Sequence, residues 1–224
     1  MPSSIIRSDS EGIELIRALA RSYWYSAVLR AGIKLGAFSL LDGGPLTPTE
    51  MARELPGDLS FVRAFLDACE VLGLVEKHSN LYANSAVASA FLVPGREQYV
   101  GGHALLHTNA WASRGSLDEL IRQGKTLLPF ETDFVDENTY RANHMLGQHN
   151  RAMTGQSDHL VDNVYLAGMQ RLIDLGGGAA SYSIALCKAN PELHSVVVDR
   201  PEPLAIARAN IGGQPRWPDL VDRR

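Results

Sequence analysis

The feature that most constrains this chain is the stretch LIDLGGGAASYSIALCKANPELHSVVVDR, residues 172–200. A short apolar run there ends in Asp174, three glycines follow at once, a segment with helical spacing comes next, and a second apolar run ends in Asp199. Strands of a parallel sheet are buried on both faces and are therefore continuously apolar. Glycines allow positive φ and the close approach of a ligand. The stretch predicts a buried strand, a tight turn, a helix and a second parallel strand.

The acid at the end of the second strand points to the kind of ligand. In an open α/β sheet, ligands bind outside the carboxyl ends of the strands, where an acid accepts hydrogen bonds from two ribose hydroxyls. The dinucleotide fingerprint GxGxxG is met poorly, because its sixth position, counted from Gly176, is Ser181. A tight turn without a ligand is the alternative. Asp199 favours a site for a nucleoside-type cofactor.

Composition excludes several classes of protein. The chain has 224 residues and is 45% hydrophobic, enough for a core in one or two domains. Its 21 basic and 25 acidic residues give a net charge of −4, which indicates neither a nucleic-acid nor a membrane partner. It shows no signal peptide and no apolar run of membrane-spanning length. Cys69 and Cys187 lack metal-binding spacing, and we expect buried thiols in a cytoplasmic protein.

The first 41 residues predict a long helix with an unusually broad apolar face. Between Glu11 and Leu41 the apolar residues recur at three- and four-residue spacing. The stripe consists of Ile13, Ile16, Leu19, Ala20, Tyr23, Ala27, Ala31 and Leu35, widened by Trp24, Tyr25 and Val28. A helix this apolar requires cover on more than one side, from its own chain or from a second copy.

The next segment predicts two helices and a hairpin. Thr47, Pro48 and Glu50 form a capping box with proline at the first helical position, and Asp58 caps a second helix that ends at Gly73. LVEK and LYAN, separated by the turn HSN, predict a β-hairpin. This is the element order of a winged helix.

Winged helices often bind DNA, so the charge of this one matters. Residues 47–76 contain two basic and six acidic side chains, a balance of −4, whereas a recognition helix offsets phosphate charge with Lys or Arg. The charge therefore favours a winged helix used for packing. A DNA-binding regulator is a distant third hypothesis, behind the two functions that the resemblance described below implies.

Residues 85–165 are predicted mainly helical. His103 and His107 lie four residues apart, but no third metal ligand has a characteristic spacing, so we predict no metal site.

Several stretches together resemble one enzyme family. LIDLGGGAASYSIALCKANPELHSVVVDRPE resembles motif I and the following acidic strand of S-adenosylmethionine-dependent methyltransferases. The sequence of this motif is most similar to that of the small-molecule O-methyltransferases of the caffeate, acetylserotonin and hydroxyneurosporene type. LSFVRAFLDACEVLGLVEK with LYANSAVASAFL resembles the winged-helix dimerisation domain of that family. NRAMTGQS is similar to the helix that precedes its motif I.

The resemblance implies a set of cofactor-binding residues. The glycine turn would surround the methionine part of S-adenosylmethionine, Asp199 would hold the ribose hydroxyls, and Arg200 and Pro201 would flank the adenosine. Ala180 stands where the family has a glycine, and Arg200 stands where it has a leucine. The cofactor-binding residues implied in this way are Met153, Ser157, Asp174, Gly176, Gly178, Asp199 and Arg200.

The predicted fold class is α/β with an α-helical N-terminal part: a winged-helix dimerisation domain followed by an incomplete Rossmann-like methyltransferase domain. We expect the dimerisation domain over residues 1–100, a helical linker over 101–165 and a partial cofactor-binding domain over 166–224. Only two strands of that domain are identified. DLVDRR resembles the segment that leads into a third strand, and the chain is expected to be truncated there.

The predicted function follows from the resemblance. It implies transfer of a methyl group from S-adenosylmethionine to a hydroxyl of a small aromatic or polyketide-like secondary metabolite. The family's general base has no counterpart, and surface or packing roles are favoured for His144 and His149, so no catalytic residue is assigned. The expected assembly is a homodimer, or a heterodimer with an intact homologue. The alternative function is a non-catalytic module that pairs with such a homologue.

Overall fold

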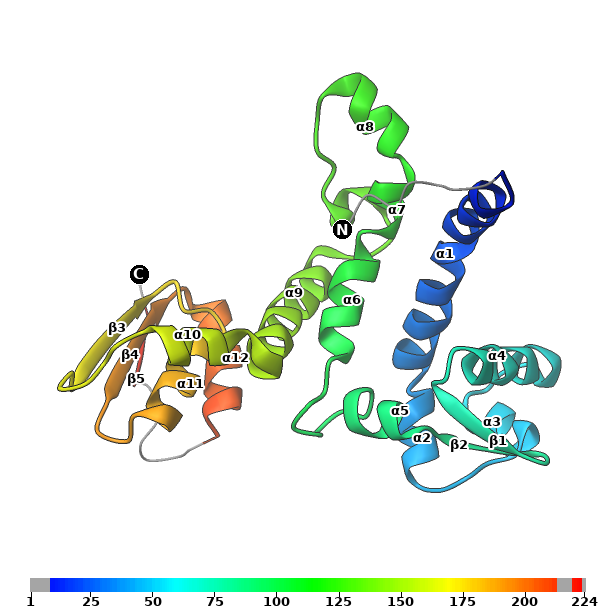
Figure 1. Ribbon diagram of the computed structural model, residues 1–224. Coiled ribbons are helices and arrows are strands. Elements are labelled where there is room, and N and C mark those ends of the chain that lie inside the picture. The colour runs from blue at the N-terminus through cyan, green and yellow to red at the C-terminus, as the bar shows by residue number, and fades with distance from the viewer. Residues whose placement is uncertain (1–8, 213–218, 223–224) are drawn as a thin grey trace. The chain divides into compact units, whose positions relative to one another are not determined.

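The chain divides into two units, residues 1–93 and 94–224 (Figure 1). The structure is a computed structural model that describes residues 9–212 and 219–222. The segment 101–165, which the sequence sets apart as a linker, lies inside the second unit together with the sheet. The three-part domain division stays a prediction.

The first unit contains five helices and a hairpin among its described residues. These elements are α1 (Asp9–Leu35), α2 (Ala37–Asp42), α3 (Pro48–Glu54), α4 (Leu59–Val71), β1 (Val75–His78), β2 (Leu81–Asn84) and α5 (Ala86–Phe91). The prediction of one uninterrupted helix to Leu41 is wrong. The first helix ends at Leu35 because Gly36 takes a left-handed conformation, with φ of 69°, before α2 begins.

Local sequence signals set the boundaries of α3, α4 and the hairpin. Thr47 Oγ1 accepts a hydrogen bond from the Glu50 amide at 3.3 Å, and the Glu50 carboxylate accepts one from the Thr47 amide at 2.8 Å. Asp58 Oδ1 accepts from the Ser60 amide at 2.9 Å at the start of α4. Strands β1 and β2 pair antiparallel, with His78 opposite Leu81. The predicted order of helix, helix and hairpin is therefore present.

The core of the first unit is closed by a polar contact between α4 and the hairpin. Phe38, Leu66 and Tyr82 are completely or almost completely buried. Tyr82 Oη donates to Asp67 Oδ1 at 2.5 Å, and Lys77 Nζ donates to the same oxygen at 2.6 Å. These two hydrogen bonds hold the pKa of the Asp67 carboxyl below its usual range, so the carboxylate stays charged where it anchors the hairpin.

Both cysteines are buried free thiols, as the sequence predicts. Cys69 lies in the same core, and burial raises its pKa to about 12. Burial is also the main cause of the raised pKa of Cys187 in the second unit. Because the thiolate is the reactive form, neither side chain is a nucleophile at neutral pH.

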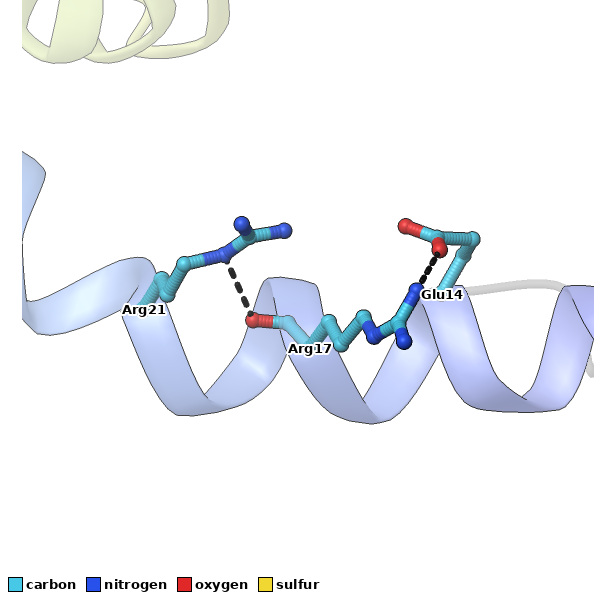
Figure 2. A network of polar contacts seen from close by, with 3 residues as sticks. All are labelled: Glu14, Arg17 and Arg21. Atoms are coloured by element: carbon cyan, nitrogen blue, oxygen red, sulfur yellow. Dashed lines mark hydrogen bonds and ion pairs between the residues drawn. The ribbon is translucent and has the colours of Figure 1, made fainter.

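The first half of α1 has little cover from the rest of its own unit (Figure 1). Ile16 and Leu19, in the middle of the predicted stripe, are 64% and 61% exposed. Charged side chains lie on the same half of α1: Arg17 Nη1 contacts Glu14 Oε1 at 2.6 Å, and Arg21 Nε donates to the Arg17 carbonyl at 3.2 Å (Figure 2). Within the described part of the chain, no helix combines the length and apolarity needed to cross a bilayer.

The second unit begins with a helical region. Its elements are α6 (Gly101–Asn109), α7 (Trp111–Gly115), α8 (Leu117–Gln123), η1 (Pro129–Thr132), α9 (Glu137–Arg151), η2 (Ala152–Gln156) and α10 (Ser157–Asn163). Helices α6 and α9 pack closely because each offers a glycine at the contact. A Cβ added at Gly102 would lie 2.4 Å from Leu146, and one at Gly147 would lie 2.8 Å from Leu106.

A parallel three-stranded sheet follows, in the order β3-β4-β5. In chain order, the strands and the helices that connect them are β3 (Arg171–Leu175), α11 (Ser181–Ala189), β4 (His194–Asp199), α12 (Pro201–Ile211) and β5 (Asp219–Asp222). The strand, turn, helix and strand predicted from residues 172–200 are confirmed. The count of two strands is wrong: Asp219–Asp222 do not merely lead into a third strand but form it, pairing with Val196–Asp199. A strand of four residues is too short for the sequence pattern alone to show this.

Among the described residues, helices cover one face of the sheet and leave the other open (Figure 1). Ser195 and Val197 of β4 are buried on the face that α11 and α12 cover, whereas Ile173 and Leu175 of β3 are 66% and 77% exposed. The prediction that β3 is buried is therefore wrong. In register with these two residues, the apolar side chains of β4 and β5 continue the same surface. We call this surface the open sheet face: Ile173, Leu175, Val196, Val198 and Val221.

The open sheet face predicts self-association of the chain. An exposed, apolar strand with a free edge favours pairing with other chains. We expect the double substitution Ile173→Lys and Leu175→Lys to increase the soluble fraction and to reduce the aggregates detected by light scattering. Tyr165→Lys, at an exposed aromatic outside this face, is the control. An equal gain in solubility from the control would contradict this role of the open sheet face.

Candidate functional site

A cavity of about 570 Å³ opens at the carboxyl ends of β3 and β4. We call it the strand-end cavity. One wall consists of the residues that follow the two strands: Gly176, Gly178, Asp199, Arg200, Glu202, Pro203 and Ile206. The other wall comes from α9 and includes Tyr140, Arg141, His144 and Met145. The location is the one that the topology of an open α/β sheet favours for ligands.

The turn after β3 depends on left-handed backbone at alternate residues. Gly176 and Gly178 have φ of 73° and 55°, and Ala180 has φ of 62°. Gly177 is required for a different reason: a Cβ there would lie 2.6 Å from Asp174 Oδ2 and 2.7 Å from Val197 Cγ1. Ala180 therefore carries a methyl group in a conformation that suits glycine, and this methyl group is fully buried.

Asp199 ties the end of β4 to the glycine turn. Its Oδ2 accepts a hydrogen bond from the Gly178 amide at 2.8 Å, and its Oδ1 accepts one from the Arg200 amide at 2.7 Å. The Gly176 amide donates to the Val198 carbonyl at 2.7 Å and closes the turn against β4. A carboxylate has about four acceptor sites, so each Asp199 oxygen can accept a further hydrogen bond from a ligand hydroxyl.

Asp174 supports the turn from behind. Its Oδ2 accepts from Ser183 Oγ at 2.8 Å, and Ser195 Oγ donates to Ser183 Oγ at 2.9 Å. These hydrogen bonds join β3, α11 and β4. Asp174 borders a separate hollow of about 520 Å³, next to His159 and Tyr182, and does not line the strand-end cavity.

Met153 and Ser157 also lie away from the strand-end cavity. Met153 packs against the core around Ile184 and Val197. Ser157 is buried, and its Oγ donates to the Ala152 carbonyl at 2.7 Å across the π-turn η2. Of the seven residues that the resemblance implies, the structure brings together Gly176, Gly178, Asp199 and Arg200. A direct role for the other three in cofactor binding stays a prediction.

Sequence reasoning missed the α9 wall of the cavity. The Tyr140 ring contacts the rings of Phe130 and His144 at tilted angles. Its centroid lies 5.5 Å from the Phe130 centroid and 6.0 Å from the His144 centroid. Met145 faces the glycine turn, since a Cβ added at Gly178 would lie 3.1 Å from Met145 Cε. The sequence favours a surface or packing role for His144, but its side chain lines the cavity. The spacing of 140, 141, 144 and 145 is that of a single helix face, which was the available signal.

The remaining histidines lie outside this cavity. His149 Nδ1 is 2.9 Å from Ser181 Oγ, and burial, followed by the charge of Lys188, lowers the pKa of this imidazole. His103 and His107 contact each other edge to face, with centroids 4.5 Å apart. Among residues 9–212 and 219–222, no cluster of three or more His, Cys, Asp or Glu side chains is arranged to hold a metal ion.

Several known proteins that are similar to this chain are methyltransferases. Residues 18–94 match the family model described as the O-methyltransferase dimerisation domain. A 3-hydroxy-5-methyl-1-naphthoate 3-O-methyltransferase of Streptomyces sahachiroi is 31% identical over 202 residues, which are 88% of this chain and 58% of that protein. The N,N-dimethyltransferase OxyT of Streptomyces rimosus is 30% identical over 193 residues, which are 82% of this chain and 55% of that protein. The chain thus spans less than two thirds of these relatives.

Solved structures agree on the fold. Human N-acetylserotonin methyltransferase, crystallised in complex with SAM, has a TM-score of 0.82 and 22% sequence identity, covering 100% of this chain and 68% of that one. The likeness confirms a helical N-terminal domain followed by an α/β methyltransferase fold. Together with the matches in sequence, it confirms the resemblance to S-adenosylmethionine-dependent O-methyltransferases.

The geometry of the turn predicts a specific sensitivity to an added methyl group. Gly177→Ala would push a Cβ against the Asp174 carboxylate and Val197, so we expect a loss of about 1–3 kcal/mol in the free energy of unfolding, the usual cost of overpacking. Gly115→Ala is the matched control, because its Cβ meets nothing within 4 Å and its helix gains from alanine. Urea unfolding of both variants measures the difference. Equal stability of the two variants would show that the turn adapts freely.

Proposed function

We propose that the chain binds S-adenosylmethionine in the strand-end cavity and belongs to a methyltransferase that acts on a small aromatic molecule. The observation that carries this proposal is the Asp199 carboxylate, held at the end of β4 by the Gly178 and Arg200 amides and bordering the cavity. A carboxylate in this position suits a ribose diol. Human N-acetylserotonin methyltransferase, which shares the fold, was crystallised with SAM, and this supports the choice of nucleoside.

The residues of the cavity suit the parts of the cofactor. Asp199 would accept hydrogen bonds from the ribose hydroxyls, and the glycines of the turn leave the backbone open to a close ligand. The α9 wall, with Tyr140 and Met145, offers apolar and aromatic surface. When bound, S-adenosylmethionine supplies an electrophilic methyl group. The contribution of this chain is to bind and orient the cofactor, because positioning accounts for much of such a transfer.

The acceptor in this proposal is a hydroxyl of a small aromatic secondary metabolite. The name of the Streptomyces sahachiroi relative specifies an aromatic 3-hydroxyl, which supports this choice. The N,N-dimethyltransferase relative makes an amine of a similar molecule the second candidate. We assign no general base, since no histidine of the described chain combines access to the cavity with a hydrogen bond that would orient it for proton transfer.

Replacing Asp199 tests the cofactor site. Asp199→Ala removes the ribose acceptor and one anchor of the turn, and we expect the affinity for S-adenosylhomocysteine to fall on the order of 10- to 100-fold, as for the loss of a charge-assisted hydrogen bond. Titration calorimetry measures this change. Asp162→Ala, at an exposed acid on α10, is the control. Unchanged affinity in Asp199→Ala would rule out the site.

We further infer that the first unit is a winged-helix dimerisation domain and that α1 forms the interface. The match of residues 18–94 to a dimerisation domain supports this inference, as does the exposed apolar stripe around Ile16 and Leu19. Glu14, Arg17 and Arg21 form polar contacts along the same half of α1, so charged side chains border the apolar stripe at the proposed interface (Figure 2). Of the two possible assemblies, a homodimer and a heterodimer with an intact homologue, we propose the homodimer.

The open sheet face supports the second candidate, a cofactor-binding module that associates with an intact homologue. Parallel sheets are normally covered on both faces, and a second chain could provide that cover. The two candidates differ in what the purified chain does alone. Turnover of a phenol by the purified chain with S-adenosylmethionine would support the enzyme, whereas no turnover by the chain alone, together with a changed turnover of an intact homologue when the chain is added, would support the module.

Charge placed on α1 tests the interface. Ile16→Glu with Leu19→Glu would bury two carboxylates at the proposed contact, and we expect sedimentation velocity to show a shift from dimer to monomer at micromolar concentration. Phe61→Glu puts one such carboxylate at an exposed apolar position on α4 and should leave the dimer intact. If Phe61→Glu alone dissociates the dimer, the interface lies elsewhere.

A further inference from the structure

The second unit contains another cavity whose chemistry differs from that of the strand-end cavity. Its volume is about 330 Å³. It collects side chains from five places: Arg96, Glu97 and Tyr99 before α6, His149 and Asn150 on α9, Met153 on η2, Lys188 on α11, and Asn210 on α12. We call it the rear cavity. Most of its lining residues are polar, whereas the core beside it, around Ile184 and Leu204, is apolar.

The charges of the rear cavity favour an anion. Arg96 and Lys188 contribute two positive charges and Glu97 one negative charge. His149 is neutral at neutral pH, because burial and the nearby charge of Lys188 lower its pKa. The lining therefore has a net charge of +1 together with several neutral hydrogen-bonding groups. This combination suits a small oxyanion, such as a phosphate or a carboxylate.

Two lining residues of the rear cavity also hold the glycine turn. His149 Nδ1 lies 2.9 Å from Ser181 Oγ, at the first residue of α11. Asn210 Nδ2 donates to the Ala179 carbonyl at 3.0 Å. Ala179 and Ser181 flank Ala180, which is held with a positive φ. The glycine turn lines the strand-end cavity, and it is thus hydrogen-bonded to two side chains that line the rear cavity, those of His149 and Asn210.

We propose that the rear cavity binds a small oxyanion and that its occupancy changes the conformation of the glycine turn. A ligand drawn to Lys188 and Arg96 would contact the two side chains that fix Ala179 and Ser181. Since coupling requires that a ligand favour one of two arrangements, the strained backbone at Ala180 is the natural element to respond. The effect on cofactor affinity rests on the proposed function, but oxyanion binding and the response of the turn do not.

The test uses inorganic phosphate and, in a parallel titration, malonate, at constant ionic strength. We expect saturable shifts of the His149 ring signals and of the Gly178 and Ser181 amide signals in nuclear magnetic resonance spectra of the full chain. A response to phosphate alone identifies a phosphate site, and one to malonate alone a carboxylate site. Lys188→Met should abolish these shifts, whereas Lys125→Met, at an exposed lysine, should preserve them.

Three results would overturn the proposal: no saturable shift with either anion, full retention of the shifts in Lys188→Met, or shifts at His149 without any at the turn. Where S-adenosylhomocysteine binds, we also expect saturating anion to change its affinity about fivefold or more, with the change lost in Lys188→Met. If S-adenosylhomocysteine does not bind at all, the proposed function fails, and the spectra still decide whether the rear cavity is an oxyanion site.

Discussion

The hydrogen bond from the Gly178 amide to the Asp199 carboxylate, 2.8 Å long, is the contact on which the candidate site depends. It joins the turn after β3 to the end of β4 and so fixes two segments that are 21 residues apart. The turn needs such an anchor, because it holds alternate residues at positive φ and fills one of those positions with Ala180. A turn held in this way loses little entropy when a ligand arrives, which favours binding.

Much of the fold is predictable because it depends on residues close together in sequence. The capping box of Thr47 and Glu50, the cap at Asp58 and the glycine turn each lie within a few residues, and the structure has all three. The position of Met153 depends on more. The π-turn at Ala152–Gln156 contains non-helical backbone at Thr154 and Gly155, so helical spacing no longer gives the directions of the side chains around it.

Burial of β3 and the α9 wall of the cavity were harder to predict, for a related reason. An apolar run such as LIDL shows that a strand suits an apolar environment but not how many elements cover it. Here α11 and α12 cover one face, and Ile173 stays exposed on the other. The contact of Met145 with the glycine turn likewise joins residues more than thirty positions apart. Neither local propensity nor motif spacing contains that information.

The two exposed apolar surfaces of the chain differ in a way that matters for assembly. On α1 the apolar stripe shares its helix with the charged residues Glu14, Arg17 and Arg21, which need water or polar partners at the border of any contact (Figure 2). The open sheet face is flanked in register by Arg171 on β3 and Asp219 on β5, and its strand edge at β3 offers backbone groups to another strand. We therefore propose α1 as the surface for specific pairing, whereas the open sheet face would gain specificity only from a partner shaped to cover it.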